Sequence, residues 1–239
     1  MGPDAAEEKA PVQGHIVTAP KPKAAHMRRD VAVLCDFDGT IVPCDTVELI
    51  YSKFAQPPCE QLNLQWTRGE ISTRQELEGC FATIKASRAQ MESVLADLAI
   101  DPAFHTFLDL CTQRGYRFAI LSDGLDWIIN FILERHGVGG LTVYSNELRF
   151  EEDGLRLSFP FFDPESPLRG VSKPTIIRRH QAEGFQVTFV GDGLSDIEAV
   201  EVADIVYARD RLLQYCRERG IDAVAFSGFA DLVTKWPDL

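Results

Sequence analysis

The chain has 239 residues, of which 45% are hydrophobic and 25% charged, and its formal net charge is −12. This length accommodates one domain with a smaller insertion, and the composition is typical of a folded globular protein. The apolar runs are too short to cross a bilayer, and the acidic balance is unfavourable to binding a phosphate backbone. We therefore expect no membrane partner and no nucleic-acid partner. A small phosphorylated metabolite remains compatible with this charge, because it needs only local cations or a metal ion.

Residues 1–29 differ from the rest of the chain. They are rich in proline and alanine, carry mixed charges and show no hydrophobic periodicity, which predicts a disordered N-terminal tail. Asp4, Glu7 and Glu8 in place of an apolar stretch disfavour a secretory signal.

The cysteines give a second indication of the compartment. There are six, with no CxxC pair: residues 35, 44, 59, 80, 111 and 216. This pattern favours free or buried thiols over a disulfide framework. We therefore expect a reducing, cytoplasmic environment.

Short apolar runs and helical segments alternate from residue 31 onward. Strands are predicted at Val31–Asp36, Arg117–Asp123, Gln186–Asp192, Ile205–Ala208 and Ala223–Ser227. Helices are predicted at Ala103–Gln113, Asp126–Arg135, Pro174–Glu183, Asp196–Ala203 and Arg209–Arg219. The runs are continuously apolar, as is typical of strands buried on both faces of a parallel sheet. This order predicts a doubly wound α/β fold.

Two segments interrupt the alternation. Residues 46–100 carry apolar side chains at helical spacing, which predicts a small helical insertion after the first strand. Thr142–Pro160 alternates around an acidic turn and is expected to form a β-hairpin. The catalytic core should then comprise residues 30–45 and 101–239.

Polar residues stand at the carboxyl ends of three predicted strands. The strands lead into Asp36-Phe37-Asp38-Gly39-Thr40, Ser122-Asp123-Gly124 and Gly191-Asp192-Gly193, with Asp196 shortly after. Ligands bind at this edge of open α/β sheets. Converging carboxylates repel one another unless a cation neutralises them, and oxygen ligands without His or Cys select a hard ion such as Mg²⁺. A hydroxyl, the nearby Lys173 and a metal together make a phosphate cradle.

Each of these motifs has an ordinary structural interpretation. DxD and SDG are common turns, GDGxxD also occurs in calcium-binding turns, and a lone lysine is usually a solvated surface residue. The whole set, in this order and with each element at a strand end, is much less compatible with coincidence.

The set resembles the four motifs of the haloacid dehalogenase-like phosphatases, over roughly residues 30–235. The resemblance implies that Asp36 is the nucleophile, which forms an aspartyl-phosphate, and that Asp38 is the general acid and then base. It also implies a phosphate site made by Ser122, Asp123 and Lys173. It places Mg²⁺ on Asp36, Asp38 (through its backbone carbonyl), Asp192 and Asp196. Residues 46–100 would be a small helical cap that favours a small substrate.

Two branches of this family are candidates. Gly69-Glu70-Ile71-Ser72 resembles the phosphoserine phosphatase branch, which binds its substrate with a Glu and a cap Arg. Here Asp45 takes the acidic position and Cys80 aligns with the arginine. A carboxylate clamp would therefore need one of three other arginines, at positions 68, 74 and 88.

Lys173-Pro174 and residues 207–216 resemble the methionine-salvage branch, whose member dephosphorylates hydroxy-keto-methylthiopentenyl phosphate. That branch often has a cysteine before the motif lysine, which residues 162–172 lack. We favour this substrate type, with phosphoserine phosphatase or a related phosphotransferase as the alternative. A catalytically silent phospholigand-binding protein is least favoured, because all the motif carboxylates are present. For Trp66, Phe81 and Trp127 we favour a position in the hydrophobic core, and a position on the wall of the substrate site is the second interpretation.

Overall fold

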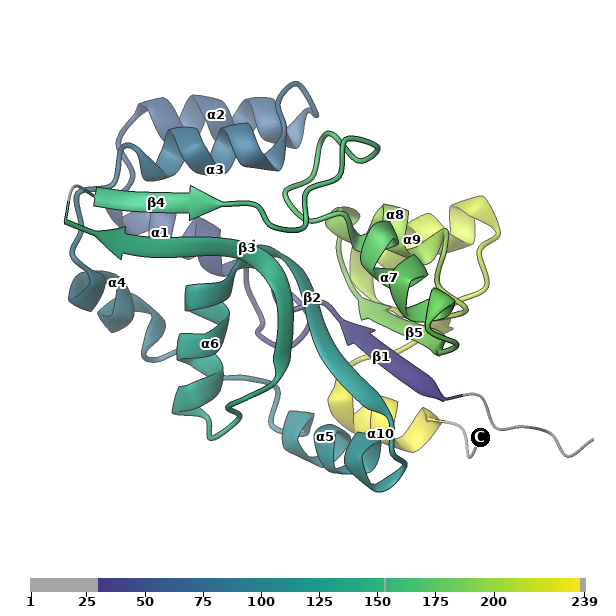
Figure 1. The fold of residues 1–239 in the computed structure, drawn as a ribbon. Coiled ribbons are helices and arrows are strands. Elements are labelled where there is room, and N and C mark those ends of the chain that lie inside the picture. The colour runs from purple at the N-terminus through teal and green to yellow at the C-terminus, as the bar shows by residue number, and fades with distance from the viewer. Residues whose placement is uncertain (1–29, 153, 237–239) are drawn as a thin grey trace, which may run out of the picture.

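The computed structural model describes residues 30–152 and 154–236, so the predicted tail at 1–29 lies outside the described residues. The described residues form a seven-stranded sheet in the order β4-β3-β2-β1-β5-β6-β7 (Figure 1). Its strands are β1 (Val31–Cys35), β2 (Arg117–Leu125), β3 (Thr142–Glu151), β4 (Gly154–Ser158), β5 (Gln186–Gly191), β6 (Ile205–Ala208) and β7 (Val224–Ala225). All neighbours pair in parallel except β3 and β4. The predicted α/β class is confirmed.

The central strand β1 is buried along its whole length, and its side chains alternate between two cores. Val31, Val33 and Cys35 face one cluster of buried side chains, and Ala32 and Leu34 face the other. This two-sided burial explains the continuously apolar run, since both faces of a parallel sheet are covered by helices.

Helices cover each face of the sheet. The first core includes α5 (Phe104–Gln113), α6 (Asp126–Arg135) and α10 (Phe229–Lys235), and the second includes α7 (Lys173–Ala182), α8 (Ile197–Val200) and α9 (Asp210–Arg219). Helix α10 is absent from the predicted elements, although Phe229 packs against Phe104 and Phe107. Among the described residues, no helix has the length and apolar character needed to cross a membrane.

The segment predicted as a helical insertion is helical. It contains α1 (Thr46–Phe54), α2 (Pro58–Thr67), α3 (Thr73–Phe81) and α4 (Arg88–Leu95). Asp45 caps α1 by accepting a hydrogen bond from the Glu48 backbone amide, and Ser72 and Ser87 form capping boxes at α3 and α4. These caps define where α1, α3 and α4 begin. In Figure 1 the helices lie on the side of the molecule toward which β1 points.

The predicted hairpin exists, but it is part of the main sheet. Strand β3 pairs in parallel with β2 through residues 142–146 and antiparallel with β4 through residues 147–151. One long strand therefore serves both partners. The alternation of apolar and polar residues comes only from residues 147–151 of β3, where one face of the strand is less covered.

One prediction about the cysteines is wrong. Cys59 of α2 and Cys80 of α3 form a disulfide, whereas Cys35, Cys44, Cys111 and Cys216 are free. The pair is 21 residues apart, and only the packing of α2 on α3 brings it together. Sequence spacing alone does not reveal such a pair.

Candidate active site

The parallel strands β1, β2 and β5 bring the predicted site residues to one edge of the sheet. Asp36 follows β1, Ser122 and Asp123 lie in the last part of β2, and Asp192 follows β5. Lys173 is the first residue of α7. Asp38, in the loop after β1, lines the same cavity as these carboxylates.

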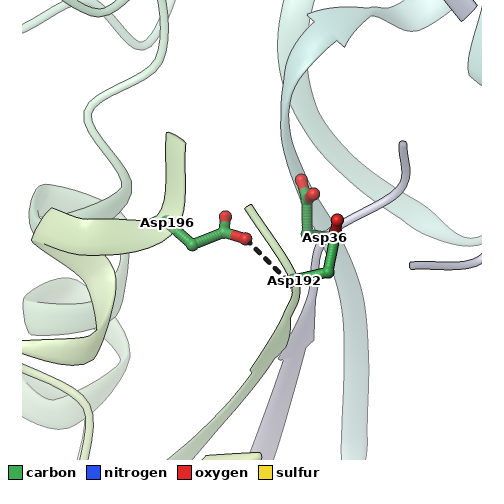
Figure 2. A group of neighbouring side chains, drawn as sticks. All are labelled: Asp36, Asp192 and Asp196. Atoms are coloured by element: carbon green, nitrogen blue, oxygen red, sulfur yellow. Dashed lines mark hydrogen bonds between the residues drawn. The ribbon is translucent and has the colours of Figure 1, made fainter. Parts of the chain in front are cut away.

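Three carboxylates form the centre of the site. Asp36, Asp192 and Asp196 each offer an oxygen within 4.8 Å of the other two, and Figure 2 shows their side chains converging from β1, β5 and the turn after β5. Asp196 is completely buried, and its Oδ2 accepts hydrogen bonds from the backbone amides of Asp192 and Gly193, both at 3.1 Å. The Asp196 carboxylate thus fixes the loop that carries Asp192.

Lys173 neutralises part of this charge. Its Nζ donates to Asp36 Oδ1 at 2.8 Å and to Asp196 Oδ1 at 2.5 Å, with only 2% of the residue exposed. Burial alone would lower the pKa of the Lys173 ammonium, but the charges of Asp196 and Asp36 outweigh it and raise that pKa above its ordinary value. Burial and the charge of Asp196 raise the pKa of Asp36.

The unshared oxygens indicate how a cation would be held. Asp36 Oδ1 bonds to Lys173 and Asp192 Oδ1 accepts from the Thr40 hydroxyl at 2.7 Å, whereas the Oδ2 atoms of Asp36 and Asp192 receive no hydrogen bond from the described residues. Both oxygens of Asp196 are engaged. An all-oxygen donor set fits Mg²⁺, with Asp36 and Asp192 placed to ligate directly and Asp196 to support them.

Glycine at position 39 makes this arrangement possible. Gly39 has φ +72°, and a Cβ there would lie 2.3 Å from Asp192 Oδ2. A side chain at this position would therefore clash with the carboxylate and strain the backbone. Arg209 donates to the Gly39 carbonyl oxygen and so holds the same loop. Sequence reasoning missed Arg209, whose role depends on the fold.

Asp38 is oriented by the start of the helical insertion. Its Oδ1 accepts from the Thr46 backbone amide at 2.9 Å. A Cβ at Gly124 would lie 2.9 Å from Asp38 Oδ2 and 3.1 Å from Ser122 Oγ, so this glycine lets both groups approach it closely. Burial, with a smaller effect from the Asp45 charge, raises the pKa of Asp38 to about 7. Asp38 can therefore carry or release a proton near neutral pH.

Ser122 and Asp123 differ in what their side chains do. Ser122 is 1% exposed, and its Oγ accepts from the Gly124 amide at 3.0 Å while its hydroxyl hydrogen has no acceptor among the described residues. Asp123 Oδ1 accepts from the Gly170 and Val171 amides, both at 2.9 Å, and Oδ2 accepts from the Thr73 hydroxyl at 2.8 Å. The Asp123 carboxylate thus ties the loop before Lys173 to α3.

A cavity of about 750 Å³ opens above the carboxylates, between the strand ends and the helical insertion. Trp66 lines it, contrary to its predicted core position, whereas Phe81 is in the core and Trp127 packs on Phe131 and Phe150. Tyr51 and Glu76 also line the cavity, and sequence reasoning missed both. The sequence feature that could have identified them is a tyrosine on the apolar face of α1 and a glutamate on the apolar face of α3.

None of the arginines considered for a carboxylate clamp lines this cavity. Arg68 pairs with Glu70, Arg88 with Glu92, and Arg74 stacks over Phe159 and Phe162. Cys80 also lies away from it, in the disulfide. The cationic side chains of the lining, Arg169 and Arg211, come from outside the helical insertion.

Comparison with known proteins identifies a family and individual relatives of this chain. A family model for haloacid dehalogenase-like hydrolases matches residues 33–201. The chain is 29% identical over 204 residues to a 2-hydroxy-3-keto-5-methylthiopentenyl-1-phosphate phosphatase of Exiguobacterium sp., covering 84% of this chain and 94% of that one. A protein of the same name from Brevibacillus brevis is 29% identical over 212 residues, covering 87% and 95%.

A bifunctional enzyme MtnB/MtnX of Bacillus licheniformis is 30% identical over 213 residues, and the chain spans 48% of its length. Among solved structures, phosphoserine phosphatase in apo form has a TM-score of 0.65 at 19% identity, covering 87% of this chain and 99% of that one. A phospho-aspartyl intermediate analogue of phosphoserine phosphatase has the same TM-score at 20% identity, with 87% and 99% covered. These structures share the fold.

Proposed function

This chain belongs to the haloacid dehalogenase-like hydrolase family, and from that premise we propose that it hydrolyses the phosphomonoester of a small metabolite through an aspartyl-phosphate. The observation that carries the proposal is the environment of Asp36. One of its oxygens is held by buried Lys173, and the other is free on the wall of a cavity that Asp38 and Ser122 also line.

In the proposed reaction Asp36 attacks phosphorus and the bond to the leaving alkoxide breaks. Asp38 then gives its proton to that alkoxide and later takes one from the water that hydrolyses the aspartyl-phosphate. The pKa of Asp38, raised to about 7, suits this exchange. Ser122 has a free hydroxyl hydrogen for a phosphoryl oxygen, and Lys173 supplies positive charge. Because the Asp123 carboxylate is fully engaged, its contribution to phosphate binding would come from its backbone amide.

Phosphatases of this family are generally magnesium-dependent. We propose that Asp36, Asp192 and the Asp38 backbone carbonyl hold Mg²⁺, with Asp196 in support. The ion would offset the repulsion between the Asp36 carboxylate and the phosphate dianion. It would also counter the carboxylate crowding that raises the pKa of Asp36.

We propose that residues 46–100 act as a cap and that the substrate is a keto or enol sugar phosphate of the methionine-salvage type. The names of the curated relatives support this choice. The cavity supports it as well, because the helical insertion contributes no lysine or arginine to the lining. Phosphoserine is the alternative. Its carboxylate would meet no cation on the helical insertion, and the arginines of the lining, Arg169 and Arg211, lie outside that insertion. A carboxylate left unpaired against the helical insertion would cost several kcal/mol, which corresponds to roughly a hundredfold or more in kcat/KM.

We propose a cytoplasmic location, where phosphorylated metabolites are made and used, with no nucleic-acid or membrane partner. The Cys59–Cys80 disulfide is unusual for a reducing compartment. The oxidation state of this pair in protein alkylated at the moment of cell lysis tests the location directly.

A panel of small phosphate esters, with p-nitrophenyl phosphate as a general substrate, tests the function. We expect Mg²⁺-dependent release of phosphate and a higher kcat/KM for keto or enol sugar phosphates than for phosphoserine. A tenfold preference for phosphoserine would overturn the substrate assignment. No release of phosphate from any ester in the presence of Mg²⁺ would overturn the activity itself.

A further inference from the structure

The part of the cavity wall that comes from the cap side is acidic as well as apolar. Asp45, Glu48 and Glu76 all line it, together with Trp66, Ile71 and Leu77 among the apolar side chains. Within the lining, no lysine, arginine or histidine comes from residues 45–100. A leaving group that enters this region therefore meets negative charge and apolar surface, which is unfavourable for an anion.

Glu76 differs from the other two acids in its burial. It is 5% exposed, whereas Glu48 lies near the surface and bonds to Asn63 at 2.7 Å. Glu76 Oε2 accepts a hydrogen bond from the Tyr51 hydroxyl at 3.2 Å. The other oxygen, Oε1, receives no hydrogen bond from the described residues, and it is not among the atoms enclosed completely by protein. Glu76 thus lines the cavity with one oxygen bonded to Tyr51 and the other without a hydrogen bond from the described residues.

A buried polar atom without a partner is costly unless a ligand or water satisfies it. Tyr51, itself 6% exposed, fixes the orientation of Glu76 from α1 while Glu76 lies on α3. Because two helices hold this pair, the free oxygen has a defined position beside the apolar side chains of Ile71 and Leu77. Such an atom discriminates between ligands that can bond to it and ligands that cannot.

We propose that Glu76, oriented by Tyr51, determines substrate specificity by hydrogen bonding to a non-anionic polar group, a hydroxyl or an ammonium, on the leaving alcohol. This inference rests on the proposed phosphatase activity and defines the class of alcohol released. A hydroxyl can bond to a carboxyl in either protonation state. Asp45 and Glu48 disfavour a carboxylate at the same place.

The test compares four matched series of alkyl phosphates of increasing chain length, which end in methyl, hydroxyl, ammonium or carboxylate. For the wild-type enzyme with Mg²⁺ we expect the best hydroxyl or ammonium ester to exceed the methyl ester of equal length by about ten- to a hundredfold in kcat/KM. The carboxylate ester should be the poorest. Because ratios between substrates are independent of the fraction of folded enzyme, they isolate specificity from stability.

Three variants test whether the preference for polar esters comes from Glu76 and Tyr51. Glu76→Met should abolish the preference for polar esters over methyl esters, and Tyr51→Phe should reduce it. Glu76→Gln distinguishes the two polar groups, because an amide still bonds to a hydroxyl but loses the attraction for an ammonium. Glu78→Met, on the exposed side of α3, is the matched control and should leave every ratio unchanged.

The inference alone would be overturned by equal kcat/KM for hydroxyl, ammonium and methyl esters in the wild type, or by a preference that persists in Glu76→Met. A carboxylate ester as the best substrate would do the same. Absence of hydrolysis of all esters, p-nitrophenyl phosphate included, would instead overturn the proposed function and this inference with it.

Discussion

The ammonium of Lys173 lies 2.8 Å from Asp36 Oδ1 in a setting that nearly excludes solvent. It also lies 2.5 Å from Asp196 Oδ1, so one cation links the strand-end carboxylate to the acid that supports the β5 loop. Lys173 therefore has two roles. It is placed to neutralise charge at the proposed phosphate site, and it holds together segments that are far apart in sequence.

Removing this cation should destabilise the protein. Lys173→Met leaves Asp36 and Asp196 buried without their partner, which should lower the free energy of unfolding by about 3–5 kcal/mol and abolish turnover. Urea unfolding followed by circular dichroism measures the change. Lys235→Met is the matched control, since Lys235 forms an exposed pair with Asp231 and should cost at most about 1 kcal/mol. Equal effects in the two variants would contradict a structural role for Lys173.

Replacing the proposed nucleophile should separate chemistry from folding. In Asp36→Asn the amide oxygen still accepts from Lys173, so the fold is retained, but an amide cannot form the acyl-phosphate and hydrolysis should be essentially lost. Release of p-nitrophenol from p-nitrophenyl phosphate measures turnover. Asp109→Asn, on the exposed side of α5, should keep full activity. Near-native turnover by the Asp36 variant would eliminate the mechanism.

The contrast between the strand-end residues and the cavity wall shows what sequence reveals here. Asp36, Ser122 and Asp192 were predictable, because continuous apolar runs identify strands and parallel strands deliver their carboxyl ends to one edge. The role of the Asp123 carboxylate was not, since its partners Gly170 and Val171 are 47 and 48 residues away. Such contacts depend on loop packing, which leaves no periodic pattern.

Elements outside the regular alternation were also hard to predict. The Cys59–Cys80 pair depends on how α2 packs on α3, and the hydrogen bond between Tyr51 and Glu76 depends on the approach of α1 to α3. Helix α10 is a short segment stabilised by aromatic contacts to α5 rather than by its own pattern. In each case tertiary packing determines the outcome and local propensity contributes little.

Chelation should remove activity reversibly. Four acidic residues without soft ligands suit a hard cation, so EDTA should abolish phosphate release and Mg²⁺ should restore it. Ca²⁺ should bind but support little turnover, because its larger and looser coordination shell disturbs the in-line geometry. Calorimetric titration of Mg²⁺ into wild type and Asp192→Asn provides a readout independent of turnover, and binding should weaken in the variant. Full activity after exhaustive chelation would refute a metal requirement.

Glu76 should make stability depend on pH. Burial raises its pKa from 4.5 to about 8, with a smaller opposing effect from the Tyr51 hydrogen bond. Below pH 4.5 the group is protonated in both the folded and the unfolded protein, and no penalty arises. As the pH rises toward 8 the unfolded state loses its proton more readily, so the contribution of Glu76 to stability declines.

Glu76→Gln removes this titration while keeping an acceptor for Tyr51. The variant should match wild type near pH 4.5 and exceed it above pH 8, by roughly 3–5 kcal/mol in the free energy of unfolding. Unfolding curves at several pH values measure the difference. Glu78→Gln, exposed on the same helix, should show a difference that is independent of pH. A constant difference for the Glu76 variant would show that Glu76 titrates normally in the folded protein.

The Cys59–Cys80 disulfide should stabilise the helical insertion by restricting the unfolded chain. Closing a loop of this length, with 21 residues of separation, corresponds to about 3 kcal/mol. The double variant Cys59→Ser, Cys80→Ser should lose about this much on urea unfolding. Reductant should lower the stability of the wild type but leave that of the variant unchanged.

Mass spectrometry after alkylation in denaturant gives an independent count of the free cysteines: four modified cysteines without reductant and all six with it. Six modified cysteines without reductant would mean that the bond does not form, and the predicted free thiols would then be correct.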